Sequence, residues 1–312
     1  MARYLACCGR VMLSPQSATF FRKEVSPRPK YRLAACIRIK NEGRFLPELL
    51  AHHRLLGFEH FFLYDNNSSD QPDKILDPFV RRGLATIVPW KTVPASPSCY
   101  KHFLENFEAE SQWVAFIDAD EFIVERVDGA LNNALARLGS NAGLAINSRY
   151  FGSSSHQVIP DGLVLEQFRR CAPLLGEHVK VIVKPQLALS YFNSHNFIYR
   201  NWSFAIDVRG RTVLGTFAAA SAASEIEINH YVYRSREDYV AKLGLGFVDS
   251  GGYKHRARRI ERVESEFLEH NSEDGSWAGE KYGSRIREFM QELGYSETYW
   301  RSVVAAPPSL RT

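Results

Sequence analysis

The sequence has few cysteines, and they follow no pattern. Its 312 residues include five cysteines, an odd number with no CxxC pair and no regular spacing, which argues against a disulfide scaffold and against a zinc ribbon. No stretch reaches 18 apolar residues, so no membrane-spanning helix is expected, and the apolar run near the N-terminus is too short for a signal-peptide core. We therefore expect a protein of the reducing cytoplasm, which leaves peripheral attachment to a membrane open.

The chain also has little net charge. Its 39 Lys and Arg against 35 Asp and Glu leave +4 over the whole length, which is too little to predict nucleic-acid binding by bulk electrostatics. With 45% hydrophobic and 12% aromatic residues, the composition is that of a globular chain that can bury a core. An anionic ligand would have to be met by a local site.

Several common catalytic motifs are missing. There is no GxGxxG after the first predicted strand, no Walker loop, no HExxH and no GxSxG. These absences argue against a dehydrogenase, a kinase, a zinc protease and a serine hydrolase.

What the sequence does contain is an alternation of strand and helix signals. A predicted strand over 32–40, a helix over 45–56 and a strand over 59–64 are typical of a parallel sheet. The alternation continues to about 235 without a linker, with strands at 84–88, 112–117, 144–148 and 179–185, and helices at 72–82, 100–110 and 127–139. We therefore expect an irregular lead-in over 1–30, one α/β sheet domain over 31–245, and a helical C-terminal extension over 246–312 with helices at 253–270 and 284–293.

Acidic and amide side chains follow three of the predicted strands, at 41–42, 65–67 and 118–120. In an open parallel sheet, ligands bind beyond the carboxyl ends of the strands. Because side chains alternate in an extended segment, Asp118 and Asp120 are expected on one side, where they can share a divalent cation with a diphosphate. The alternative is an acidic turn with helix-capping aspartates.

Four segments carry a family resemblance. In chain order, Lys40-Asn41-Glu42, the run from Tyr64 to Asp70, the run from Phe116 to Phe122, and Asn229-His230-Tyr231 resemble the motifs of glycosyltransferases related to families 2 and 92. The resemblance covers about residues 32–245 and implies the GT-A fold, a Rossmann-type, mostly parallel sheet flanked by helices. It implies transfer of a hexose from a nucleotide sugar, expected to be UDP-linked, to a glycan or other hydroxyl acceptor. It also favours inversion of the anomeric centre, which the residues themselves do not establish.

The resemblance implies roles for individual residues. Asp65 would accept a hydrogen bond from the N3–H of uracil, with Asn41, Glu42 and Asn67 also binding the nucleotide. Asp118 would lie near the ribose and the metal, Asp120 would bind Mn²⁺ or Mg²⁺, and His230 would be the third metal ligand. The nucleotide ligands are thus Asn41, Glu42, Asp65, Asn67 and Asp118, and the metal ligands are Asp118, Asp120 and His230.

Other residues are candidates for catalysis or for binding the diphosphate. Glu166, in a predicted strand, is a candidate base for the acceptor hydroxyl, and His156, in a Gly/Ser loop, is a second candidate catalytic residue. Lys180 and Lys242 are predicted to neutralise diphosphate oxygens, as is the region from Arg234 to Arg236, although such residues often face water. His195 falls where family members carry a histidine, and no role is assigned to it.

Two alternative hypotheses stay open. One is a catalytically silent module of the same fold that binds a nucleotide sugar or a carbohydrate. The other is a nucleotidyltransferase, which normally needs a glycine-rich basic loop after the first strand, and residues 40–44 match that loop poorly.

Overall fold

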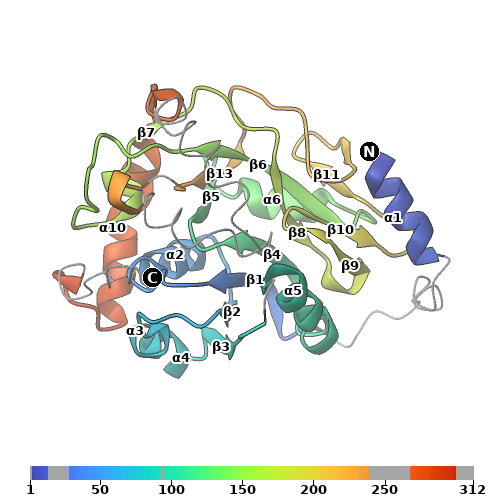
Figure 1. The fold of residues 1–312 in the computed structure, drawn as a ribbon, viewed down its shortest axis with the longest axis horizontal. Coiled ribbons are helices and arrows are strands. Elements are labelled where there is room, and N and C mark those ends of the chain that lie inside the picture. The colour runs from blue at the N-terminus through green and yellow to red at the C-terminus, as the bar shows by residue number, and fades with distance from the viewer. Residues whose placement is uncertain (1, 13–27, 93–94, 233, 239–267, 300–312) are drawn as a thin grey trace, which may run out of the picture.

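One ten-stranded sheet forms the centre of the protein, in a computed structural model that describes residues 2–12, 28–92, 95–232, 234–238 and 268–299 (Figure 1). Its main path runs in the order β12-β11-β6-β8-β4-β1-β2-β3, and β5 and β13 attach beside β6. The strands are β1 (Tyr31–Ile39), β2 (His60–Asp65), β3 (Ala85–Pro89), β4 (Ser111–Asp118), β5 (Glu121–Glu125), β6 (Gly143–Tyr150), β8 (Val179–Val183), β11 (Ala205–Asp207), β12 (Thr212–Val213) and β13 (Ile226–His230).

Strand directions bring several chain segments to the same edge of this sheet. β1 runs parallel to β2 and β4, whereas β8 runs antiparallel to β4 and β6. β13 runs parallel to β6. The residues that follow β1, β2, β4 and β13 and those that precede β8 therefore lie at one edge, which we call the strand-end edge. The predicted α/β class with a mostly parallel central sheet flanked by helices is confirmed.

Two apolar cores lie on the two faces of the sheet. The first contains residues of α2, α6 and α10, and the second contains residues of α5 and of the hairpin β9–β10. β1 contributes to both, because Leu33, Ala35 and Ile37 face the first core while Ala34 and Cys36 face the second. The elements outside the main sheet are α1 (Ala2–Met12), α2 (Leu46–Leu55), α3 (Pro72–Ile75), α4 (Asp77–Arg81), α5 (Ala95–Asn106), α6 (Ala130–Arg137), β7 (Arg170–Cys171), α7 (Val164–Gln167), η2 (Pro185–Leu187), β9 (Ala188–Asn193), β10 (Asn196–Tyr199), β14 (Glu273–Asp274) and α10 (Trp277–Glu292).

The expectation of an irregular lead-in is wrong for residues 2–12, which form helix α1. Tyr4 is buried, and its hydroxyl donates to the carbonyl of Phe197 in β10 at 2.8 Å. Figure 1 shows α1 lying beside β10 at one side of the sheet. The buried Tyr4 thus fastens this helix to the hairpin.

The expectation that Glu166 lies in a strand is also wrong, because this residue belongs to the short helix α7. The N–H groups of Val164 and Leu165 donate to the buried carboxylate of Glu48 at 2.6 and 3.0 Å. Since the first N–H groups of a helix need an outside acceptor, a residue 116 positions away in the chain completes this turn. The residues near Glu166 in the sequence do not indicate this contact.

The described part of the C-terminal extension belongs to the main core. α10 packs against α2 and α7, and its Tyr282 and Ile286 are buried in the first core. The predicted helix over 253–270 falls largely outside the described residues, and the predicted domain boundaries stay predictions. Within the described ranges, no helix has the length and apolar character needed to cross a membrane.

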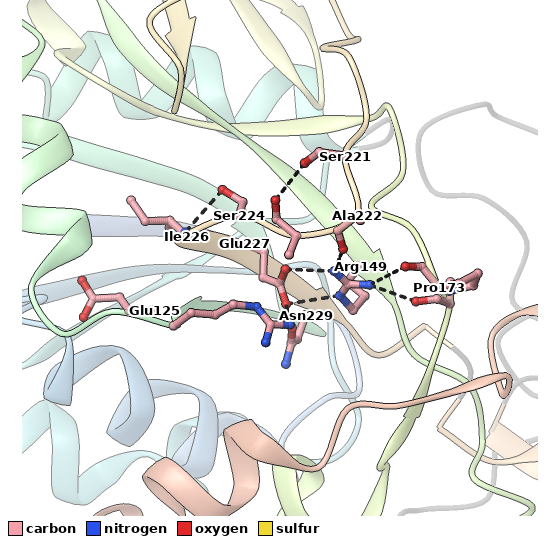
Figure 2. Close-up of polar contacts among 12 residues, drawn as sticks. Glu125, Arg149, Pro173, Ser221, Ala222, Ser224, Ile226, Glu227 and Asn229 are labelled. Atoms are coloured by element: carbon pink, nitrogen blue, oxygen red, sulfur yellow. Dashed lines mark hydrogen bonds and ion pairs between the residues drawn. The ribbon is translucent and has the colours of Figure 1, made fainter.

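A buried ion pair anchors β13, the strand that ends at His230. Glu227 of β13 is fully buried and accepts hydrogen bonds from Nε and Nη2 of Arg149 at 3.2 Å each, and from Nη2 of Arg126 at 2.9 Å. Figure 2 shows the Arg149 guanidinium between Glu227 and the surrounding loops. The Arg149 guanidinium also donates to the carbonyls of Ala172, Pro173 and Ala222. Arg149 therefore ties β6, β13 and two loops together.

We expect Arg149→Met to lower the free energy of unfolding by about 3 to 5 kcal/mol, because it leaves the Glu227 carboxylate buried without its main cation. Urea unfolding measures this change. Arg81→Met is the matched control: Arg81 pairs with Asp77 at 2.5 Å, but the two side chains are 73% and 48% exposed, so we expect a loss of about 1 kcal/mol or less. Equal losses in the two variants would contradict this account of β13.

Candidate functional site

A tight turn at Ala119-Asp120 joins β4 to β5 at the strand-end edge. Asp118 ends β4, and Asp120 lies in the turn, so the alternation expected of an extended segment does not apply to this pair. The N–H of Asp118 donates to Oε2 of Glu121 at 2.8 Å and closes the turn from within. The two aspartates consequently meet different partners.

Asp118 is held by two cations of the protein. Its Oδ2 lies 2.5 Å from Nζ of Lys180, and its Oδ1 lies 3.7 Å from Nη2 of Arg38. Burial on its own would raise the pKa of Asp118, but Lys180 and Arg38 lower it to about 2, so this carboxylate is ionised at neutral pH.

Lys180 is a buried counter-ion for two carboxylates. Its ammonium lies 3.3 Å from Oε2 of Glu121 in addition to its contact with Asp118. Burial opposes the charged form of Lys180, but Asp118 and Glu121 outweigh burial and raise its pKa above the ordinary value. The pKa of Glu121 is itself raised, mainly by burial. The predicted contact of Lys180 with a diphosphate stays a prediction, since its described partners are side chains of the protein.

Asp120 and His230 lie side by side, as expected from the sequence. Nε2 of His230 is 3.5 Å from Oδ1 of Asp120, and its Nδ1 is 3.7 Å from Oε1 of Glu121. The antiparallel pairing of β13 with β5 sets this arrangement, because His230 is in register with Glu121. Burial would lower the pKa of His230, but Asp120 and Glu121 raise it above the ordinary value.

The residues at this edge fit a partial cation site. Over the part of the chain that the structure describes, no three Cys, His, Asp or Glu side chains converge as a preformed metal centre. Asp118 is engaged by Lys180 and Arg38, so it fits a metal less well than Asp120 and His230, which face each other. One carboxylate and one imidazole can hold Mg²⁺ or Mn²⁺ when substrate phosphate and water complete the shell.

The loops after β1 and β2 are bonded to each other. Asn41 adopts a left-handed conformation with φ 55°, which asparagine tolerates, and its Oδ1 accepts from the N–H of Ser69 at 2.8 Å. The N–H of Gly43 donates to Oδ2 of Asp70 at 2.7 Å. Asn41 therefore helps to hold the loop after β2 in place, and its predicted contact with a nucleotide is a separate expectation.

Asp65 ends β2 and keeps one carboxylate oxygen available. Its Oδ1 accepts from the N–H of Ser68 at 3.0 Å, whereas its Oδ2 accepts no hydrogen bond from any described residue. Asn67 is exposed, with φ 60°. Asn66, by contrast, is buried and donates to the carbonyl of Trp90 at 2.8 Å. Asp65 and Asn67 thus border the strand-end edge, and Asn66 is part of the support.

Glu42 is paired with a buried arginine. Nη2 of Arg234 lies 2.6 Å from Oε2 of Glu42, its Nε lies 3.1 Å from Oδ2 of Asp238, and its guanidinium lies 3.7 Å from the ring centre of Phe45. Burial would lower the pKa of Arg234, but Asp238 and Glu42 raise it above the ordinary value. Arg234 therefore fixes the segment after β13 against the loop after β1. Arg236 is exposed.

The two predicted catalytic residues contact other parts of the protein. Both oxygens of Glu166 accept from Arg287 of α10, at 2.6 and 2.5 Å. Nε2 of His156 is hydrogen-bonded to the carbonyl of Gln167 at 3.1 Å. The structure does not join either residue to the Asp118–Glu121 turn by a contact, so their role as a base stays a prediction. Lys242 lies outside the described residues.

His195 lies in the turn between β9 and β10, against the start of β8, and is neutral. Its Nδ1 is hydrogen-bonded to the carbonyl of Val179 at 2.9 Å, so this nitrogen carries the proton. Burial lowers the pKa of His195 to about 4, and the charge of Lys180 acts in the same direction. The histidine that the sequence left without a role thus belongs to the strand-end edge.

Arg38 is a site residue that the sequence interpretation missed. It is in register with Asp118 in the pairing of β1 with β4, and its guanidinium contacts that carboxylate. The signal was an arginine near the end of the apolar run of β1. A charged residue in a buried strand needs a partner, and the neighbouring strand supplies it.

A central α/β sheet with an acidic cluster at its strand ends is the arrangement expected of a glycosyltransferase of the GT-A type. The model of Glycosyltransferase family 92 matches residues 32–205, and the chain belongs to this family. A family 92 protein of Ricinus communis is 31% identical over 221 residues, which cover 68% of this chain and 37% of the relative. One of Arabidopsis thaliana is 25% identical over 238 residues, which cover 71% and 39%. The chain thus spans less than two-fifths of the length of these relatives.

Solved structures show weaker similarity. S. aureus TarS in complex with UDP-GlcNAc has 16% identity and a TM-score of 0.35, over 50% of this chain and 46% of that chain. A second structure of TarS has 13% identity and a TM-score of 0.37, over 89% of each chain.

We expect Lys180→Met to destabilise the protein by about 3 to 5 kcal/mol at pH 7, because the buried carboxylate of Glu121 and the half-buried carboxylate of Asp118 lose their shared cation. In the wild type, the depressed pKa of Asp118 stabilises the fold above about pH 4, and this contribution is lost as the pH falls towards 2. In the variant, burial without Lys180 raises the pKa of Asp118 and of Glu121, so protonation relieves the defect. The stability gap between the two proteins should narrow from pH 7 to pH 3, as measured by urea unfolding.

Lys184→Met is the control for this experiment. Lys184 follows β8, is half-buried, and donates to the carbonyl of Gly139 rather than to a carboxylate. Its effect on the free energy of unfolding should therefore change little between pH 7 and pH 3. A Lys180→Met gap that stays constant or widens over this range would contradict the assigned ion pairs.

Proposed function

We propose that this chain is a metal-dependent glycosyltransferase that moves a hexosyl group from UDP-hexose to a hydroxyl acceptor with inversion. Membership of Glycosyltransferase family 92 supports glycosyl transfer. The observation that carries the proposal is the pairing of Asp120 with His230 at 3.5 Å, next to the ion pair of Asp118 with Lys180. A carboxylate and an imidazole therefore lie together at the point where the strand ends of β4 and β13 meet.

In this proposal, the nucleotide lies over the carboxyl ends of β2, β1 and β4. Asp65 accepts the N3–H of uracil through the oxygen that no described residue occupies. Asn41 and Glu42 form the neighbouring wall, held by Ser69 and Arg234. Asp118 follows on β4, which suits the ribose end of the nucleotide.

The diphosphate then reaches the turn between β4 and β5. A divalent cation held by Asp120 and His230 would supply Lewis-acid stabilisation of the departing diphosphate. Lys180 and Arg38 offset the charges of Asp118 and Glu121, so that an anionic ligand meets less repulsion at this turn. These ion pairs thus reduce the electrostatic repulsion between the strand-end edge and a negatively charged donor.

Inversion requires one in-line displacement by the acceptor hydroxyl and a base that takes its proton. Glu166 and His156 are still the candidates for this base. Glu166 would have to leave Arg287 to accept a proton, since both of its oxygens are engaged. His156 would have to release the carbonyl of Gln167.

We expect Asp120→Asn to lower Mn²⁺-stimulated release of UDP from UDP-hexose by about a hundredfold or more, with the fold unchanged by circular dichroism. Asp77→Asn is the control, because the Asp77 side chain in α4 is 48% exposed and pairs with Arg81. Near-normal turnover by folded Asp120→Asn would overturn the metal site. Binding of UDP-hexose without turnover in the wild type would instead support the alternative, a catalytically silent binding module.

We expect Asp65→Ala to weaken UDP binding by about 10- to 100-fold, because the uracil N3–H loses a charged acceptor. Titration calorimetry with UDP and Mn²⁺ measures this change. Asp73→Ala in α3 is the control, since Asp73 is exposed. If both variants bind UDP as the wild type does, the uracil is not at Asp65.

A further inference from the structure

An aromatic cluster borders the strand-end edge on the flank away from the proposed nucleotide site. In the sheet order, β1 and β2 lie on one side of β4 and β8 lies on the other. His178 immediately precedes β8, two residues before Lys180, and forms an antiparallel bridge with Phe217. Because side chains alternate in extended chain, His178 and Lys180 lie on the same side of the sheet.

His178 is close to the charged groups of the proposed site. Burial lowers its pKa; Glu177 opposes this shift, and His230 and Lys180 add to it. Its ring centre lies 5.0 Å from that of His195 and 4.7 Å from that of Phe217. The three rings therefore form a continuous group next to Lys180 and His230.

Phe217 has an exposed side chain on a backbone that is held by hydrogen bonds. Its side chain is 56% exposed. The N–H of Val179 donates to the carbonyl of Thr216 at 3.1 Å, and the N–H of Ala218 donates to the carbonyl of Glu177 at 2.9 Å. These bonds hold the chain on both sides of Phe217 against the start of β8, so the ring is presented on a rigid support.

The chemistry of this cluster suits a pyranose ring. The face of a phenyl ring carries partial negative charge and attracts the weakly positive C–H groups on the apolar face of a sugar. The pKa values of His178 and His195 are both lowered, which favours neutral imidazoles. Because Nδ1 of His195 donates to the carbonyl of Val179, its Nε2 can accept from a sugar hydroxyl. One apolar face flanked by polar groups that point at its rim is the usual composition of a small-ligand site.

We propose that Phe217, with His178 and His195, forms the acceptor subsite, and that the acceptor is therefore a hexopyranoside whose ring stacks on Phe217. This inference rests on the proposed function. A donor that extends from β2 across β4 brings its sugar to the flank of β8, where the acceptor hydroxyl has to arrive. The aromatic cluster lies on that flank.

The test uses saturation-transfer NMR on the full chain with UDP and Mn²⁺, and three methyl hexosides as probes: methyl β-glucopyranoside, methyl β-galactopyranoside and methyl α-mannopyranoside. Glycerol serves as a hydroxyl compound without a ring. We expect at least one hexoside to bind and glycerol not to bind. Phe217→Leu, which keeps an apolar side chain but removes the ring face, should weaken that hexoside about tenfold, whereas Phe217→Tyr should bind it nearly as the wild type does.

Val80→Ala is the control, because Val80 is an exposed apolar residue of α4, which packs against β3 at the opposite flank of the sheet. UDP affinity is measured for every variant by calorimetry and should be unchanged in all of them. The inference is overturned if no hexoside binds the wild type, if Phe217→Leu binds as the wild type does, or if Phe217→Leu loses UDP affinity. Failure of the wild type to bind UDP would instead overturn the proposed function.

Discussion

The ammonium of Lys180, placed between the carboxylates of Asp118 and Glu121, is the contact on which the strand-end edge depends. Three acids within four residues would repel one another at the end of a buried strand. Lys180 belongs to β8, which runs antiparallel beside β4, so the pairing of these strands places the Lys180 ammonium next to Asp118. Asp120 faces His230 in the same turn, and in the proposed function these two side chains bind the cation.

The edge divides into three parts according to the order of the strands. β1 and β2 supply a corner of bonded loops with Asp65 beside it, β4 with β13 supplies the charged centre, and the start of β8 supplies an aromatic flank. Each part is held by contacts between residues far apart in the chain, such as Glu42 with Arg234 and Arg149 with Glu227. In the proposed function, the base of the donor lies at the first part and its diphosphate at the second, and the aromatic flank is the proposed acceptor subsite.

Much of the sheet could be predicted from the sequence because buried parallel strands appear as apolar runs that end in polar residues, as β1, β2 and β4 do. The pairing of Asp120 with His230 could also be predicted from the sequence, because the motif around His230 carries the family resemblance. The partners of Asp118 were not, since Arg38 and Lys180 approach it from two other strands. Glu166 was misjudged for the same reason: its helix is completed by Glu48 and its carboxylate by Arg287.

The most direct test of the central claim is the anomalous scattering of Mn²⁺ in crystals of the protein grown with UDP. The account predicts a single strong peak within coordination distance of the Asp120 carboxylate and Nε2 of His230, in contact with the diphosphate, while Lys180 keeps its contact with Asp118. Bound UDP with no Mn²⁺ peak at Asp120 and His230, or with a peak held by other residues, would contradict it.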